Sequence, residues 1–359
     1  MTIERQTGVR IGKRQALEIV KKCASDFDAF YQEQSLRLPD KVNKVPILVL
    51  TTDAKGIVML PSGLREETQK RFSSSNQKLK HRLSKGEKRN RKRMAQVASI
   101  YFIARFVRKP EDIHNEFLRK KAMQKRPRPL GKRVWASVEK EASVVISELF
   151  DEAHRRDAKH YKEWVVLVDG QGYQHRSIKR IAKQRGATIT IILDIVHVLE
   201  YLWDAAHLFF EESSQSAEDW VSSKLLDVLN GQGRKVAGSI RMSAAKRDLS
   251  EKQNKLAETC ANYLTTNKQY IDYCTYLQKG YSIGTGVIEG TCRYLIKDFI
   301  PITGARWGLD GAEAILKLRS NRSSNDWEDY WNFHLKQEFG RNYASKYQDI
   351  DQVCSAFSS

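Results

Sequence analysis

The chain has 359 residues, of which 41% are hydrophobic, which is enough for one large domain or two modest ones with a real apolar core. Its 62 lysines and arginines against 43 acids give a net charge of +19, which indicates a polyanionic partner, nucleic acid first. The sequence has no apolar run of about 18 residues and no cleavable signal, which argues against a membrane protein. We expect a cytoplasmic, nucleoid-associated protein. The five cysteines are scattered, so free thiols and no structural zinc are expected.

The first elements in chain order are a helix and two short strands. Residues 10–35 repeat apolar side chains near a 3.6-residue period, which predicts an amphipathic helix packed on the core. Residues 45–61 read as two strands, VPILVLTT and IVMLP, separated by Asp-Ala-Lys-Gly, which favours a hairpin. Asp53 is therefore predicted at the end of the first strand.

A polar and densely basic segment follows at residues 62–93 and ends in HRLSKGEKRNRKR. In a chain this basic we predict that it contacts the DNA backbone, with an ordinary solvated charge run as the alternative. AQVASIYFIARFV then reads as a third, buried strand, and residues 110–160 read as helical after a basic connector with prolines. The proposed DNA-binding cations of the basic segment are Arg89, Arg91, Lys92 and Arg93.

The next stretch predicts a strand, a helix and a strand. WVVLVDG is a continuous apolar run closed by Asp169 and Gly170, a helix follows, and TITIILDIVHVLEYLW begins as a strand and continues as a helix. A strand, helix, strand unit places its two strands parallel. Residues 204–279 are helical in pattern throughout, which predicts an all-helical insertion before the segment GTGVIEG.

This order of elements fits an α/β protein with an RNase H-like mixed sheet, in which two parallel strands extend three antiparallel ones. An all-helical insertion and flanking helices complete the predicted fold. The expected organisation is an N-terminal helical region at 1–43, the first part of the core at 44–203, the insertion at 204–279, the final helices of the core at 280–340 and a tail at 341–359.

Three acids are the candidate catalytic and metal-binding residues. Asp53 and Asp169 each follow an apolar run, so neighbouring strands would bring them together, and Glu289 would arrive from the segment after the insertion. Two Mg²⁺ ions about 3.5–4 Å apart, bound by a few carboxylates, can hold the attacking and leaving oxygens of a phosphoryl transfer. Taken singly, each acid also has a structural interpretation as a turn former, an N-cap or a first-turn helix acid.

Asp194 and His197 are the candidate accessory residues. Their spacing of three lets both side chains share a helix face, from which they could orient the metal ligands. In one alternative Asp194 is a helix N-cap and His197 a satisfied core residue. In another, Asp194 replaces Asp169 as the second metal ligand.

Basic and aromatic residues near Glu289 are candidates for DNA binding. Arg293 and Lys297 lie one and two turns after Glu289 on the same predicted face, where they could hold a phosphate or be ordinary surface cations. Arg306 and Trp307 follow, and the indole could stack on an unpaired base or pack in the core.

The motifs GTGVIEG, TGARW, GAEAILKLRS and WEDYW, with VVLVDG and ILDIVHVLEYLWDAAHLFF upstream, together resemble a DDE transposase of the bacterial insertion-sequence ISKra-type family. The similarity extends from about residue 46 to residue 331. It implies an RNase H-like catalytic domain, two Mg²⁺ or Mn²⁺ ions, and cleavage and strand transfer at the inverted repeats of the element. It assigns the three catalytic acids to Asp53, Asp169 and Glu289, and the Asp-x-x-His element to Asp194 and His197.

Two other functions compete with a transposase. The first is a non-catalytic DNA-binding protein derived from a transposase, such as a repressor of the element. The second is an RNase H-like nuclease that cuts without strand transfer. The expected partners are double-stranded DNA, as terminal inverted repeats and as target, and a second copy of the chain, because pairing two DNA ends calls for a dimer or a larger assembly.

Overall fold

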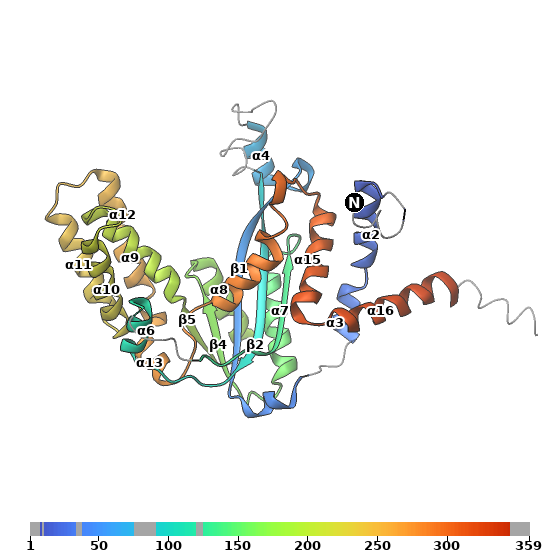
Figure 1. The fold of residues 1–359 in the computed structure, drawn as a ribbon, viewed down its shortest axis with the longest axis horizontal. Coiled ribbons are helices and arrows are strands. Elements are labelled where there is room, and N and C mark those ends of the chain that lie inside the picture. Colours follow the sequence, from blue (N-terminus) through green and yellow to red (C-terminus); the bar gives the residue numbers. More distant parts are fainter. Residues whose placement is uncertain (1–7, 9–10, 34–37, 75–90, 120–124, 345–359) are drawn as a thin grey trace, which may run out of the picture.

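The centre of the protein is a five-stranded mixed sheet in the order β3-β2-β1-β4-β5 (Figure 1). The computed structural model describes residue 8 and residues 11–33, 38–74, 91–119 and 125–344. β1 pairs antiparallel with β2, which pairs antiparallel with β3, whereas β1, β4 and β5 are parallel. The predicted α/β class and mixed sheet are therefore confirmed. The strands are β1 (Ile47–Val58), β2 (Lys92–Ile103), β3 (Leu130–Ser137), β4 (Glu163–Val168) and β5 (Ile189–Leu193).

β1 is one strand of 12 residues, and the predicted hairpin at Asp-Ala-Lys-Gly is wrong. The turn-like residues stay extended because β2 pairs with β1 along its whole length, with Asp53 opposite Val97. Gly56 instead makes room for the partner strand, since a Cβ there would lie 2.8 Å from Cδ of Lys92. Asp53 therefore lies in the middle of a strand, with Lys55 on the same face.

The third antiparallel strand comes from a region predicted to be helical. Residues 110–160 form α6 (Pro110–Phe117), β3 and α7 (Ala142–Arg156). In the strand sequence LGKRVWAS, the first residue is followed by a glycine at φ +56° and two cations, so the strand shows neither a clean alternation nor an apolar run. The predicted N-terminal helix is likewise divided into α2 (Lys13–Cys23) and α3 (Phe27–Glu33).

Helices cover both faces of the sheet. α7 and α8 (Gly172–Gln184) pack against each other behind the sheet in Figure 1. In front lie α15 (Leu309–Ser324) and the orange segment that contains α14 (Gly286–Cys292). Side chains of this front layer, such as Ile288 and Leu316, pack with Ile57 and Val97 of the two long strands in an apolar cluster on this face of the sheet.

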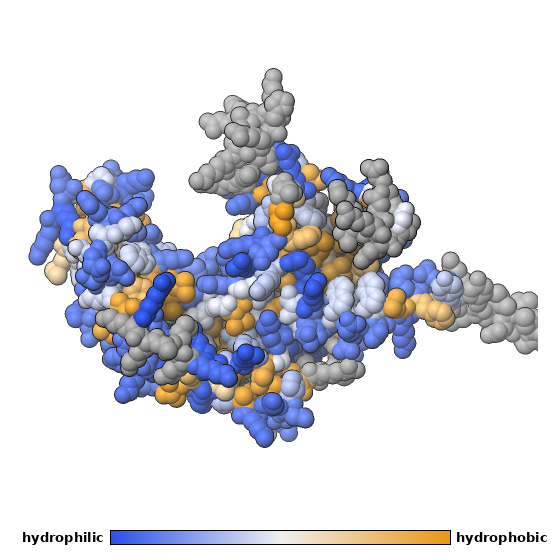
Figure 2. All heavy atoms as spheres, in the orientation of Figure 1, coloured by the Kyte–Doolittle hydropathy of each residue, from blue (hydrophilic) through white to orange (hydrophobic). Residues whose placement is uncertain are grey.

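The chain between β5 and α14 is a group of helices on the left of Figure 1. It leaves the sheet at Leu193 and returns at Ile283, where the Ile195 amide donates to the Ile283 carbonyl at 2.9 Å. The group stands apart from the upper end of the sheet, so the outline is hollowed between them (Figure 2). Its helices are α9 (Ile195–Phe209), α10 (Gln215–Leu229), α11 (Gly233–Ala245), α12 (Glu251–Thr266) and α13 (Tyr273–Gln278).

The outer helices join the two ends of the described chain. α16 (Trp327–Phe339) packs on α3, and α15 packs on α2. The predicted basic segment at 62–93 contains α4 (Glu66–Ser74), passes outside the described residues and ends at the start of β2. None of the helices described has the length and apolar character that a membrane crossing requires.

Candidate functional site

A cleft of about 270 Å³ lies where the middle of β1, the end of β4 and the starts of α9 and α14 meet. Asp53, Asp169 and Glu289 all line it, so the structure brings together the three acids singled out in the sequence. They come from a central strand, from the loop after the neighbouring parallel strand, and from a helix of the covering layer. The other lining residues are Thr52, Lys55, Val196, His197, Glu200, Thr285, Ile288 and Lys297.

Asp53 is buried and held by three donors. The Ala54 amide donates to Oδ1 at 2.6 Å, the Cys292 thiol donates to Oδ2 at 3.3 Å, and the Lys55 Nζ lies 2.9 Å from Oδ2. Burial alone would lower the pKa of Lys55, but its hydrogen bond to Asp53 and the charge of that carboxylate outweigh burial and raise it. Lys55 is therefore an ammonium ion and is the cation paired with Asp53 in this structure.

Asp169 is positioned by the loop that follows β4. Gly170 has φ +91°, and a Cβ there would lie 2.8 Å from both Cδ1 of Leu193 and the hydroxyl oxygen of Tyr263. The Tyr263 hydroxyl donates to the Asp169 carbonyl at 3.1 Å, and the Gln171 side-chain amide donates to Oδ2 at 3.0 Å. A tyrosine of α12, in the helical group, thus fixes the backbone that carries a cleft carboxylate.

Glu289 lies in the first turn of α14, and Asp194 fixes where that helix begins. The fully buried Asp194 carboxylate caps α9 by accepting from the Val196 amide at 2.9 Å, and it also accepts from the Thr285 hydroxyl just before α14. Asp169 lines the cleft, whereas Asp194 does not, so Asp169 stays the predicted second metal ligand.

His197 does line the cleft, but its partner is not Asp194. The Nδ1 atom of His197 lies 2.8 Å from Oε2 of Glu200, one turn further along α9. The predicted accessory pair is therefore split, because Asp194 is an N-cap inside the protein whereas His197 faces the cleft with Glu200.

Several carboxylates lie close together in the cleft, and their surroundings disfavour ionisation of two of them. Burial, and then the negative charge of Asp53, raise the pKa of Asp169, against the opposing hydrogen bond from the Gln171 backbone. Burial, followed by the charge of Asp194, raises the pKa of Glu289. Glu200 is engaged with His197, which leaves Asp53, Asp169 and Glu289 as the carboxylate donors of the cleft. Carboxylate oxygens are the donors that Mg²⁺ takes in proteins, so this donor set and its excess of negative charge suit a divalent cation.

A tighter acidic group lies elsewhere and already has its cation. Among the described residues, Asp26, His334 and Glu338 are the one set of three whose ligand atoms all lie within 4.8 Å of one another. His334 Nδ1 lies 2.6 Å from Oδ2 of Asp26, and the Arg341 guanidinium donates to both carboxylate oxygens at 2.7 Å. This arrangement is an ion-pair network that joins the start of α3 to α16.

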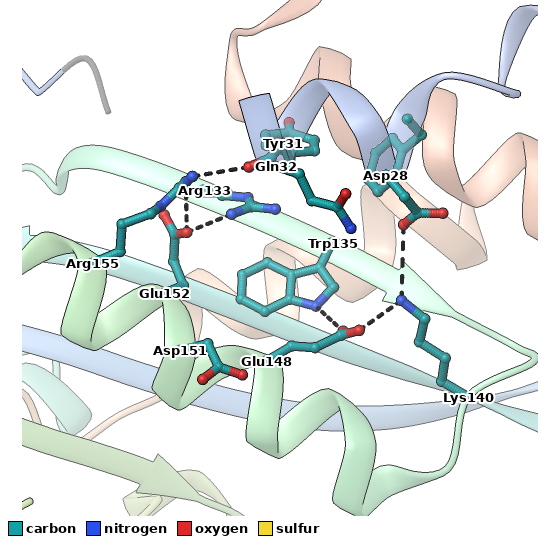
Figure 3. A pocket seen from close by; sticks show the side chains of 11 residues that line it. Asp28, Tyr31, Gln32, Arg133, Trp135, Lys140, Glu148, Asp151, Glu152 and Arg155 are labelled. Atoms are coloured by element: carbon teal, nitrogen blue, oxygen red, sulfur yellow. Dashed lines mark hydrogen bonds and ion pairs between the residues drawn. The ribbon is translucent and has the colours of Figure 1, made fainter. Parts of the chain in front are cut away.

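A larger pocket, of about 530 Å³, lies between α3, β3 and α7 and contains none of the predicted site residues (Figure 3). Its charges are largely paired internally. Lys140 contacts Glu148 at 2.6 Å and Asp28 at 3.9 Å, and Arg133 contacts Glu152 at 2.5 Å. Because its acids and bases compensate each other, this pocket does not have the unbalanced negative charge of the smaller cleft.

The two cations predicted to follow Glu289 on one face are separated. α14 passes into a π-helical turn at Arg293–Lys297, in which the Asp298 amide donates to the Arg293 carbonyl at 2.9 Å. Lys297 lines the cleft, whereas the exposed Arg293 pairs with Asp298 at 3.3 Å. The wider turn adds a residue to the helix, so the spacing expected for an α-helix does not apply.

Two of the other predicted DNA-binding side chains have structural partners. Arg93 donates to the carbonyl oxygens of Val138, Gly63 and Glu139 at 2.6, 3.1 and 3.3 Å, and burial lowers its pKa. The Trp307 indole donates to the Ile300 carbonyl at 2.9 Å, which favours the packing alternative over base stacking.

The remaining cations of the prediction lie at the surface or outside the described residues. The guanidinium of the half-buried Arg91 lies 4.2 Å from the centre of the Phe72 ring. Lys92 and Arg306 are exposed. Arg89 lies outside the part of the chain that the structure describes.

Lys55, Glu200 and Tyr263 were not singled out in the sequence, although each contacts a predicted residue or lines the cleft. Glu200 had a local signal, because it lies three residues after His197 in a predicted helix and can share its face. Lys55 lies in a segment that favours a turn, so the strand rule did not point to it. Comparison of the chain with known protein families, with curated proteins and with solved structures found no match.

Proposed function

We propose that this protein is a DDE-type DNA transposase, which cleaves the inverted-repeat ends of its element and transfers them into target DNA. The observation that carries the proposal is the meeting of Asp53, Asp169 and Glu289 in one cleft. The strand order and directions support the RNase H-like fold that belongs to this proposal, with three antiparallel strands extended by two parallel ones. The net charge of +19 supports DNA as the partner.

Asp53, Asp169 and Glu289 would bind the metal, as two Mg²⁺ or Mn²⁺ ions. Such ions, when bound, lower the pKa of water and stabilise charge on a phosphodiester that is under attack. The protein holds the carboxylates in place through the Ala54 amide on Asp53 and the Tyr263 hydroxyl behind Asp169. Lys297 would contact a phosphate at the cleft.

The proposed chemistry has two steps. Water first attacks the phosphodiester at an end of the element, and the broken bond leaves a 3′-hydroxyl. That hydroxyl then attacks a phosphodiester of the target and displaces its 3′-oxygen, which joins element to target. Holding two DNA ends for these steps would require a dimer or a larger assembly at the nucleoid, which we propose as the working form.

The test is cleavage and strand transfer by the purified protein on labelled DNA that carries the ends of the element, with Mg²⁺. Nicked and joined products are expected, and Glu289→Gln should abolish both. Glu200→Gln is the matched control, because Glu200 is a second helical carboxylate of the same cleft but not one of the three acids. Undiminished cleavage by Glu289→Gln would refute the proposal.

Two outcomes would favour the competing functions. DNA that is retarded in a gel but never cut would indicate a non-catalytic binding protein derived from a transposase. DNA that is cut without joined products would indicate an RNase H-like nuclease.

A further inference from the structure

The exposed side of α8 carries four cations and no acid. Arg176, Lys179, Arg180 and Lys183 are all exposed, at spacings of three and four residues that place them along one side of the helix. The opposite side packs into the core through Ile178, Ile181 and Ala182. We call the four cations the α8 basic face.

The α8 basic face has no ion-pair partners among the described residues. Arg185, just beyond the helix, pairs with Asp151, but no carboxylate lies within ion-pair distance of the four cations. Lys179 lies over the Tyr270 ring at 5.1 Å, which leaves its charge uncompensated. Like charges four residues apart on a helix repel each other. An anionic partner would relieve the repulsion within this stripe.

The position and length of the stripe match a nucleic-acid backbone. α8 begins at Gly172, three residues after Asp169 in the cleft. From Arg176 to Lys183 the helix rises roughly 10 Å, because each residue adds about 1.5 Å. Duplex DNA carries one charge per about 1.7 Å of axis, so roughly six phosphate charges fall within that length. Four cations therefore meet a comparable density of phosphates.

We propose that the α8 basic face binds the phosphate backbone of duplex DNA that flanks the segment held at the cleft. The choice of DNA over another polyanion rests on the proposed function. The charge pattern and the position of the helix are observed independently of that function. The interaction would be independent of sequence, because phosphates carry no base information.

The experiment compares binding of a labelled DNA duplex of arbitrary sequence, without divalent metal so that no cleavage occurs. The test variant is Arg176→Gln, Lys179→Gln, Arg180→Gln and Lys183→Gln combined. The matched control removes four exposed cations from the helical group, as Arg234→Gln, Lys246→Gln, Lys252→Gln and Lys255→Gln combined. Both variants have the same net charge, so a general charge effect would weaken both equally.

The test variant is expected to bind on the order of tenfold or more weakly, with a salt dependence less steep by about 0.9 for each phosphate that is no longer neutralised. The control should bind like the parent protein. Lys179→Arg with Lys183→Arg should retain binding, which separates the effect of charge from a damaged fold. Equal binding by the test variant and the control would overturn the inference.

The outcome is separable from that of the proposed function. If the parent protein binds duplex through α8 but never cleaves it, the transposase proposal fails and this inference stands. If the test variant binds and the parent cleaves, the inference fails and the transposase proposal stands. A parent protein that binds no duplex would overturn the inference.

Discussion

At the scale of single residues, each cleft carboxylate depends on contacts from distant parts of the chain. The Thr285 hydroxyl that fixes the start of α14 bonds to Asp194, 91 residues away, and the Cys292 thiol that donates to Asp53 is 239 residues away. The Tyr263 hydroxyl reaches the carbonyl of Asp169 across 94 residues. Contacts with distant segments therefore add to the local ones from Ala54, Lys55 and Gln171 in positioning the cleft acids.

Glu289→Gln should stabilise the metal-free protein at neutral pH. Burial raises the pKa of Glu289 above its usual value of 4.5, so ionisation is harder in the folded state than in the unfolded chain. The folded state then binds the proton more tightly, and stability falls as pH rises through this range. We expect the melting temperature of the variant to exceed that of the parent at pH 7, by a margin that shrinks towards pH 4. The measurement is thermal unfolding in a chelator.

Added Mg²⁺ should reverse the order of the melting temperatures, so that the parent protein melts above Glu289→Gln. A ligand that binds only the folded state adds about 2.7 kcal/mol at one hundred times its dissociation constant. The parent should gain this stabilisation and Glu289→Gln should gain less, while Glu200→Gln should respond like the parent. A Mg²⁺ response identical in all three proteins would contradict the assignment of Glu289 as a metal ligand.

The three acids were predictable, but their supporting residues were not. VPILVLTTD and WVVLVDG are apolar runs that reach an acid, and such runs predict buried strands whatever the rest of the chain does. Tyr263 lies within α12 and Thr285 just before α14, and neither segment shows a local sign of its contact with a distant acid. Which acid would face the cleft, Asp169 or Asp194, was also open, because both follow strand patterns.

At the scale of elements, the errors in prediction came from local signals that the sheet overrode. Asp-Ala-Lys-Gly favours a turn on its own, yet β2 pairs across it residue by residue. β3 shows no strand pattern because it is the edge strand, with one side on β2 and the other on α15. The π-helical turn after α14 likewise has no sequence signature.

The outer edge of β3 is closed by side chains of α15. Ser324 accepts from the Val134 amide at 2.9 Å and donates to the Val134 carbonyl at 3.0 Å. Glu313 accepts from the Val138 amide at 2.8 Å. Unpaired strand edges are sites of association between chains, so these contacts also keep β3 from pairing with another sheet.

Glu313→Ala should destabilise the protein by about 1–3 kcal/mol, because the buried Val138 amide would lose its acceptor. Glu313→Gln keeps a side-chain carbonyl oxygen at the same position and should cost clearly less. Urea unfolding of the three proteins measures the difference. Equal losses in the two variants would mean that packing volume or charge, and not the hydrogen bond to the strand edge, is what Glu313 contributes.

At the scale of the whole molecule, the two ends of the described chain are joined. The Tyr31 hydroxyl donates to Asp326 at 2.8 Å, and Asp26 pairs with His334 and Arg341, more than 300 residues away. Contacts between α3 and α16 therefore join residues at opposite ends of the described chain, and contacts of such sequence separation carry a high entropic cost of loop closure.

Asp26→Asn should destabilise the protein by roughly 1.5–3 kcal/mol at neutral pH, the range for hydrogen bonds to charged groups. Arg341 lowers the pKa of Asp26 below its usual 3.8, although burial opposes the shift. The stabilisation is therefore present above pH 3.8 and is lost as pH falls through the lower, folded value. Urea unfolding across a pH series should show the gap between parent and variant closing in acid.

Glu338→Gln serves as the control for Asp26→Asn, because Glu338 contacts the same Arg341 at the surface and should contribute little. A gap between parent and Asp26→Asn that stays constant down to strongly acid pH would show that the carboxylate charge is not what joins the two helices.

The hydrogen bond between Ile195 and Ile283 has a consequence for how this protein can change in evolution. The chain leaves the sheet and returns to it at positions that are joined by one hydrogen bond, so the helices between them form an insertion whose two ends are adjacent. Residues gained or lost at the end of the insertion far from the sheet, for example between α10 and α11, should leave the hydrogen bond between Ile195 and Ile283 intact. They should displace neither β5 nor α14. Length can therefore vary there while the distances among the carboxylates are inherited unchanged.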